Sequence, residues 1–151
     1  MKKYFLPFLL LLIITASSCK KQIVYQTRYL TFNANPHYVG SYDTTNFVSH
    51  IYIQEQKNNI NFLVDLIGGD VSKTYKLQIY QYDTTQIYGY SENPVIDMGT
   101  MANNLPVGFD YSTMTFQEFT ENFKGYYIVH DPANIQKDTT TLLIFGKIGN
   151  W

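Results

Sequence analysis

Apolar and polar side chains alternate near the middle of the chain, from Tyr75 to Tyr82. One side of this stretch carries Tyr75, Leu77 and Ile79. The other side carries Lys76, Gln78, Tyr80 and Tyr82. A period of two is typical of a half-buried β-strand and does not make one face of a helix. The pattern predicts a central strand with an apolar face and a polar face.

Two more alternating stretches, Phe47 to Gln56 and Ile60 to Leu66, lie on either side of Asn58-Asn59. Asparagine tolerates the left-handed conformations of tight turns, so the pattern predicts a β-hairpin. We expect one face of the hairpin to be buried, with Phe47, Ile51, Ile53, Ile60, Phe62, Val64 and Leu66. His50 falls on the other face, where we expect a surface or cross-strand role.

The remaining elements are short and separated by residues that favour turns. Further strands are predicted at 28–32, 95–98 (ending at Gly99), 126–130 and 141–148. Residues 103–108, with Asn103-Asn104, Pro106 and Gly108, are predicted to be a connection. Many short strands between turns indicate an all-β sandwich or barrel.

One segment breaks the β pattern. Thr115 and Glu118 have the spacing of a capping box, and Phe116, Phe119 and Phe123 follow at helical spacing. They predict one short helix near 116–122.

Three Asp-Thr-Thr triplets begin at Asp43, Asp83 and Asp138. They share no flanking pattern and lack the alternating acidic spacing of a calcium loop. Because aspartate accepts hydrogen bonds from nearby backbone amides, we expect three local turns.

The N-terminus has the pattern of a secretory signal, with Lys2-Lys3 before a short apolar run that ends in Thr15-Ala16-Ser17-Ser18-Cys19. Small residues before a cysteine resemble the lipobox of bacterial lipoproteins, in the relaxed form of Bacteroidetes-like sequences. The resemblance implies cleavage before Cys19 and lipid attachment there. The alternative is an ordinary signal peptide, which would leave the chain's single cysteine as an exposed thiol.

The expected organisation is a signal peptide at 1–18, a lipidated tether at 19–27 and one domain at 28–151. Removal of 18 of the 151 residues leaves 133, enough for one core. It also removes two of eleven cations, leaving nine against twelve carboxylates, a formal charge of −3. This balance disfavours a nucleic-acid partner, because such binding needs clustered cations.

Residues 60–150 resemble the CHRD-like branch of the copper-zinc superoxide dismutase-like sandwiches. The resemblance is carried by the segments at 62–69, 75–80, 123–130 and 143–149, in that order. It implies an Ig-like, superoxide dismutase-like Greek-key β-sandwich. The family places a His-x-His pair of copper ligands where this chain has Gln78 and Tyr80, and only His130 matches a family ligand position.

One imidazole cannot hold a metal that needs three or four ligands, so Gln78, Tyr80 and His130 are interpreted as degenerate metal-site positions, with no metal or other cofactor expected. His130 is expected to bond backbone or solvent at a strand end. A metal-binding or enzymatic protein using His50 and His130 together is a further alternative. Glu118 and Glu121, three residues apart, are expected to form a solvated helix face rather than a catalytic pair.

Tyrosine is abundant, with fourteen in the chain. Tyr80, Tyr82, Tyr88 and Tyr90 are a candidate aromatic binding surface, with core packing as the alternative. The sequence thus predicts a non-catalytic binding or envelope-structural lipoprotein of the bacterial outer membrane, with a glycan-binding accessory lipoprotein as the alternative. The membrane, through Cys19, and a protein or glycan are the expected partners. The leaflet stays open, although Lys20-Lys21 favours the periplasmic side.

Overall fold

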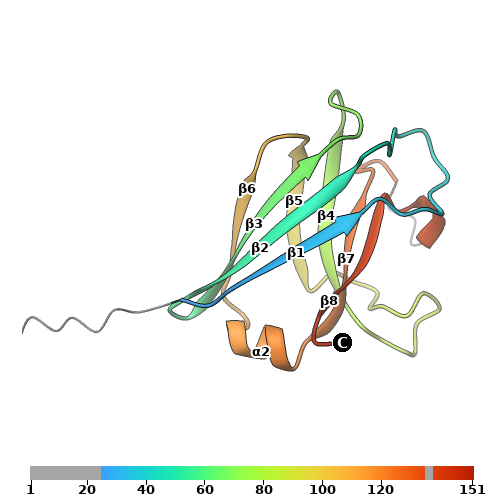
Figure 1. The fold of residues 1–151 in the computed structure, drawn as a ribbon. Coiled ribbons are helices and arrows are strands. Elements are labelled where there is room, and N and C mark those ends of the chain that lie inside the picture. The colour runs from blue at the N-terminus through green and yellow to red at the C-terminus, as the bar shows by residue number, and fades with distance from the viewer. Residues whose placement is uncertain (1–24, 135–137) are drawn as a thin grey trace, which may run out of the picture.

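The computed structural model describes residues 25–134 and 138–151, which form two antiparallel sheets of four strands each (Figure 1). Sheet A contains β1 (Thr27–Asn33), β2 (Val48–Gln56), β3 (Asn59–Ile67) and β6 (Val107–Tyr111), in that order. Sheet B contains β5 (Ile96–Ala102), β4 (Thr74–Gln81), β7 (Lys124–His130) and β8 (Ile144–Gly149), in that order. The expected all-β sandwich is confirmed.

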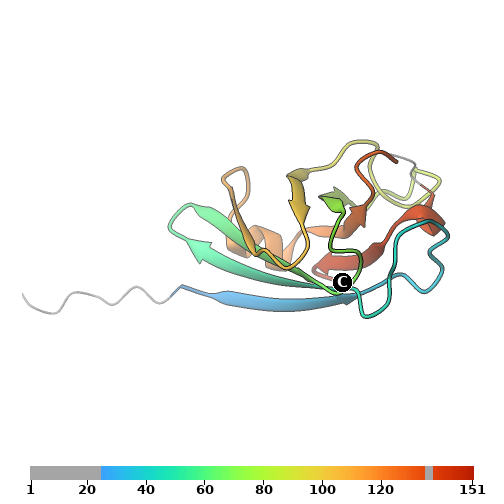
Figure 2. The same cartoon turned by 90° about the horizontal axis from the view of Figure 1, so that it is seen from above.

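The chain crosses between the sheets three times, and Figure 2 shows the two layers. After the β2–β3 hairpin it moves to sheet B for β4 and β5, then returns so that β6 pairs with β3. It crosses again, and β7 pairs with the other side of β4. Strand β4 therefore lies inside its sheet, as the central strand of the prediction requires.

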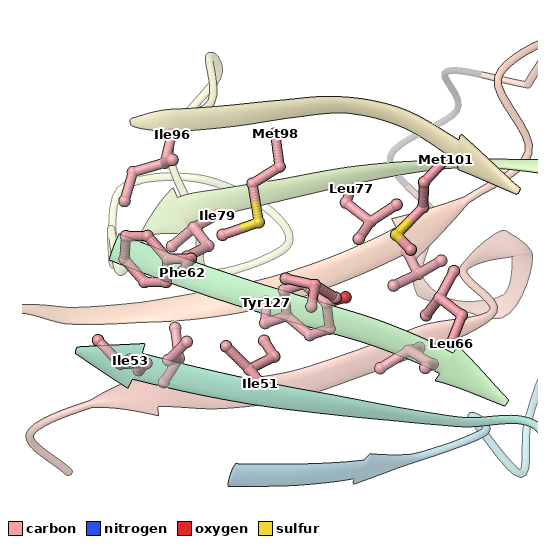
Figure 3. Close-up of a cluster of buried hydrophobic side chains, with 14 of the residues drawn as sticks. Ile51, Ile53, Phe62, Leu66, Leu77, Ile79, Ile96, Met98, Met101 and Tyr127 are labelled. Atoms are coloured by element: carbon pink, nitrogen blue, oxygen red, sulfur yellow. The ribbon is translucent and has the colours of Figure 1, made fainter. Parts of the chain in front are cut away.

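The core lies between the inner faces of the sheets, and Figure 3 shows part of it. All seven hairpin residues expected on the buried face are at most 1% exposed, as are Tyr75, Leu77 and Ile79 of β4. Strand alternation places these side chains in one layer, where burial of apolar area stabilises the fold. The apolar faces predicted from the sequence are confirmed, but β4 is not half-buried as expected, because Gln78 and Tyr80 on its polar face are buried as well.

Two predictions in the middle of the chain were wrong. Strand β5 does not end at Gly99 but continues to Ala102, because the register against β4 shifts there and Gly99 adopts a φ of +78°. Between these paired positions β5 has one more residue than β4, and the strand continues beyond this irregularity. Strand β6 was assigned to a connection, although Gly108 lies within it and pairs with Leu63.

The helix and the turns match the prediction. Helix α2 (Phe116–Glu121) begins with the complete Thr115 and Glu118 capping box. In the three triplets, Oδ1 of Asp43, Asp83 and Asp138 accepts the amide hydrogen of the second threonine at 2.8, 2.9 and 3.0 Å. A one-turn 3₁₀ helix, η1 (Thr139–Thr141), follows Asp138. No helix in the described part of the chain is long and apolar enough to cross a membrane.

Candidate functional site

The polar face of β4 is largely buried, and Gln78 is its centre. Its Oε1 accepts the hydroxyl hydrogen of Tyr80 at 2.8 Å and lies 3.0 Å from Nε2 of His130. Its Nε2 donates to Oδ2 of Asp97 at 3.2 Å. Gln78, Tyr80 and His130 are each no more than 8% exposed. The structure thus brings Gln78, Tyr80 and His130, the positions interpreted from the sequence as a degenerate metal site, into one hydrogen-bonded group.

Asp97 joins this group to the surface. Its Oδ1 lies 2.6 Å from Nζ of Lys76 and also accepts the amide hydrogen of Gly99 at 2.8 Å. Partial desolvation acts to raise the pKa of Asp97, but the hydrogen bonds from Lys76, Gly99 and Gln78 outweigh it and hold that pKa below its usual range. Burial, and then the charge of Asp97, raise the pKa of Tyr80. These pKa shifts favour the charged form of the Asp97 carboxylate and the neutral form of the Tyr80 phenol.

His130 uses both ring nitrogens within the protein. Nδ1 lies 2.9 Å from the carbonyl oxygen of Asp131 and 3.2 Å from that of Asn134, while Nε2 faces Gln78. Neither nitrogen is left to coordinate an ion. Among residues 25–134 and 138–151, no three His, Cys, Asp or Glu side chains are close enough together to hold a metal.

His50 lies on the other sheet. Its Nδ1 is 2.6 Å from the hydroxyl oxygen of Tyr29 and 3.2 Å from Oγ1 of Thr31, its direct partner across β1 and β2. His50 and His130 alternate with core residues and therefore point away from the core on opposite faces of the sandwich. They cannot share one ligand, and the cross-strand role expected for His50 is confirmed.

The four candidate tyrosines divide into two pairs. Tyr80 and Tyr90 are 7% and 3% exposed and pack edge to face, with ring centres 5.1 Å apart. Tyr82 and Tyr88 are 39% and 41% exposed. Burial of the first pair removes it from any accessible surface.

A different aromatic group lies on the outer face of sheet B, and we call it the aromatic platform. It consists of Tyr82, Tyr126, Phe145 and Trp151. Tyr126 is its centre: its ring centre lies 4.6 Å from that of Phe145, 5.2 Å from that of Trp151 and 6.3 Å from that of Tyr82. The ring centres of Tyr82 and Trp151 are 5.0 Å apart. Trp151 is 45% exposed, so the platform offers open ring area at its Tyr82 and Trp151 end.

Backbone geometry places Trp151 on the platform. Gly149 has a φ of +95°, and a Cβ there would meet the carbonyl oxygen of Phe123 at 2.2 Å, so glycine is required. Nε1 of Trp151 then donates to the carbonyl oxygens of Gly125 at 3.1 Å and Ile148 at 3.0 Å. The indole is held against β7 and β8 by its polar edge, which leaves ring area exposed.

Sequence reasoning found Tyr82 but missed the other three members. Tyr126 and Phe145 lay inside predicted strands, where alternation alone would have paired them on one face with Lys147. No local pattern around Trp151 indicated its position, because that position depends on Gly149 and on hydrogen bonds to a different strand.

A shallow hollow at the helix end of the sandwich is lined in part by Gln81, Met114, Glu118 and Phe123. Its carboxylate already has partners, since an oxygen of Glu118 accepts from the amide and the hydroxyl of Thr115 at 2.8 and 2.9 Å. Glu121 accepts from Gln117 at 3.0 Å. These contacts give the two glutamates structural roles on the helix.

Comparisons with protein-family models, with curated proteins and with solved structures gave no match. Cys19 lies outside the described residues. Within the described residues, the aromatic platform brings two exposed rings, those of Tyr82 and Trp151, together on one sheet face.

Proposed function

We propose that this protein is a lipid-anchored, extracytoplasmic β-sandwich that binds carbohydrate through the aromatic platform without catalysing a reaction. The observation that carries the proposal is the contact of Tyr82 and Trp151, two exposed rings with centres 5.0 Å apart on one sheet face. Exposed tyrosine and tryptophan combine apolar ring area with a polar edge. Sugars present the same combination, with C–H groups on the ring face and hydroxyls around the rim.

The packing of buried rings against the platform favours a binding role. Tyr90 packs against Tyr126 and Phe145, with ring centres 6.1 and 6.0 Å away, and Tyr80 packs against Tyr90. Rings held by packing lose little freedom when a ligand arrives, which favours affinity. We also propose that the chain belongs among the superoxide dismutase-like sandwiches as a member without metal ligands. Stoichiometric copper or zinc in the purified protein would overturn the proposed absence of a metal site.

Binding is tested by electrophoresis of the full-length protein through gels that contain individual polysaccharides, with a panel of neutral and acidic chains. We expect at least one of them to retard the protein. Tyr82→Ala and Trp151→Ala should each weaken this binding by roughly tenfold, through loss of a packing surface. Tyr52→Ala is the matched control, because Tyr52 is 45% exposed on the opposite sheet.

Two outcomes would count against carbohydrate binding: no polysaccharide retards the folded protein, or the platform variants are retarded as strongly as the Tyr52 control. Thermal melting of each variant shows whether its fold is retained, so that loss of binding is not confused with unfolding.

The anchor is tested separately. Cys19→Ser removes the thiol that would carry the lipid and should move the protein from the membrane fraction to the soluble fraction. Full membrane association of this variant would contradict lipidation at Cys19 while leaving the binding proposal intact.

A further inference from the structure

Two lysines border the aromatic platform on the outer face of sheet B. Lys147 is directly opposite Tyr126 in the pairing of β7 and β8. Lys124 precedes Tyr126 by two residues on β7, and its carbonyl oxygen accepts the amide hydrogen of Tyr82 at 2.8 Å. Both lysines are exposed, and strand alternation puts them on the same face as Tyr126. The cations therefore stand beside the exposed rings.

Their charges are not neutralised locally. Within the part of the chain that the structure describes, neither Lys124 nor Lys147 forms an ion pair, whereas Lys76 on the same face is paired with Asp97. Nζ of Lys147 lies 4.4 Å from the ring centre of Trp151. An ammonium group over an aromatic ring can still donate its N–H groups to an acceptor. This contact therefore positions Lys147 and leaves its N–H groups available to a ligand.

Carboxylates also lie near the platform, and their positions restrict where an anion can be bound. Asp83 directly follows Tyr82, and Asp138 interacts electrostatically with Tyr90. In each aspartate, Oδ1 accepts a hydrogen bond from a backbone amide two residues later, at 2.9 Å for Asp83 and 3.0 Å for Asp138. The side of the platform that favours an anion is therefore the side formed by β7 and β8.

We propose that the ligand is an acidic polysaccharide, a chain whose sugar rings carry carboxylates, as uronic acids do. The sugar ring packs on Tyr82 and Trp151, and its carboxylate accepts hydrogen bonds from Lys124 or Lys147. This inference rests on the carbohydrate binding proposed above and adds the charge of the ligand. Anionic membrane lipids present a similar charge, but polybasic membrane binding typically uses about four to eight clustered cations, more than these two lysines.

The chain offers a convenient reporter, because Trp151 is its only tryptophan. Fluorescence of the full-length protein is titrated with oligomers of polygalacturonate, alginate and hyaluronate. Methyl esters of the same oligomers are the matched neutral ligands. We expect a change in Trp151 emission with at least one acidic oligomer and weaker binding as salt rises, because exposed charges are screened. The methyl ester should bind roughly tenfold or more weakly.

Lys124→Gln and Lys147→Gln should each weaken binding of the acidic oligomer, by up to about fivefold. Lys57→Gln, an exposed lysine in the β2–β3 turn of the other sheet, is the matched control. The lysine variants are also compared in the gel assay, which does not depend on fluorescence.

The outcomes separate the two proposals. Equal affinity for acid and ester, or unchanged binding by both lysine variants, would overturn the charge inference while carbohydrate binding stands. Absence of binding to every neutral and acidic chain would overturn both. Binding of the protein to phosphatidylglycerol vesicles through Lys124 and Lys147, with no carbohydrate bound, would identify the platform as a membrane contact instead.

Discussion

Ser49 and Tyr127 hydrogen bond across the interior of the sandwich, with their side-chain oxygens 2.9 Å apart. Ser49 belongs to β2 in sheet A and Tyr127 to β7 in sheet B, and neither has any exposed surface. Burial raises the pKa of Tyr127, so the phenol stays protonated, and each hydroxyl depends on the other for a partner.

A double-mutant cycle tests this pair. Ser49→Ala or Tyr127→Phe alone leaves one buried hydroxyl without its partner and should cost about 1–3 kcal/mol in the free energy of unfolding. The double variant leaves no orphaned hydroxyl and should cost less than the sum of the two, as measured by urea denaturation. Strictly additive losses would show that the two hydroxyls are not coupled.

Gly68 and Gly89 form a second matched pair, since both have a φ of +76°. An added Cβ at Gly68 would meet the carbonyl oxygen of Asn46 at 2.2 Å, whereas one at Gly89 meets nothing within 4 Å. Gly89→Ala should therefore show only the cost of the left-handed backbone, roughly 1–2 kcal/mol. Gly68→Ala should lower the urea midpoint further, because backbone must also move. Equal midpoints for the two variants would contradict this reading of the β3–β4 connection.

The group around Gln78 should be sensitive to loss of its central amide. Gln78→Ala removes the acceptor of the Tyr80 hydroxyl and the oxygen that faces His130, both of them buried. We expect a loss of about 1–3 kcal/mol in stability. Gln81→Ala, at the exposed end of the same strand, is the control and should change little. A Gln78 variant as stable as the control would mean that water replaces the amide without cost.

The turns formed by Asp43 and Asp83 should make the protein less stable at acidic pH. Hydrogen bonds from Thr45 and Thr85 hold the pKa values of Asp43 and Asp83 below their usual range. A lowered pKa in the folded state means that the folded carboxylate binds protons less readily than the unfolded one. The stabilisation is therefore complete above the unfolded value, about 3.9, and is lost as pH falls through the folded value.

Asparagine at these two positions keeps an oxygen acceptor for the threonine amides but cannot titrate. The double variant Asp43→Asn and Asp83→Asn should lose less stability than the unmodified protein between pH 7 and pH 3, measured by thermal melting. An unchanged acid slope would assign the pH dependence to other carboxylates, of which Asp97 and Glu118 also have lowered pKa values.

Elements that depend on residues close together in the chain were predicted correctly from the sequence. Alternation identified the buried faces of β2, β3 and β4, the capping box identified α2, and each Asp-Thr-Thr triplet identified a turn. These signals succeed because strand faces and caps are formed by residues close in the chain. Strand β6 was missed because Pro106 and Gly108 resemble a turn, while its position depends on pairing with β3, more than 40 residues earlier.

The site was less predictable than the fold. The resemblance matched Gln78, Tyr80 and His130 to one region, and in the structure they form hydrogen bonds with one another. It did not indicate that both ring nitrogens of His130 would face oxygen acceptors of the protein. The exposure of Tyr82 and the burial of Tyr80 could not be separated by alternation, since both lie on the same face. What separates them is the segment that brings Tyr90 over Tyr80, a contact made after the strand has ended.

The hydrogen bond from Nη1 of Arg28 to the carbonyl oxygen of Gly149, 3.2 Å long, joins the first strand of sheet A to the last strand of sheet B. Strand β1 also pairs with β2 along its whole length. A pulling force applied to the chain before β1 would therefore be shared by both sheets where the chain enters sheet A. Through the Arg28 hydrogen bond, part of that force would act on β8, the strand that leads to Trp151.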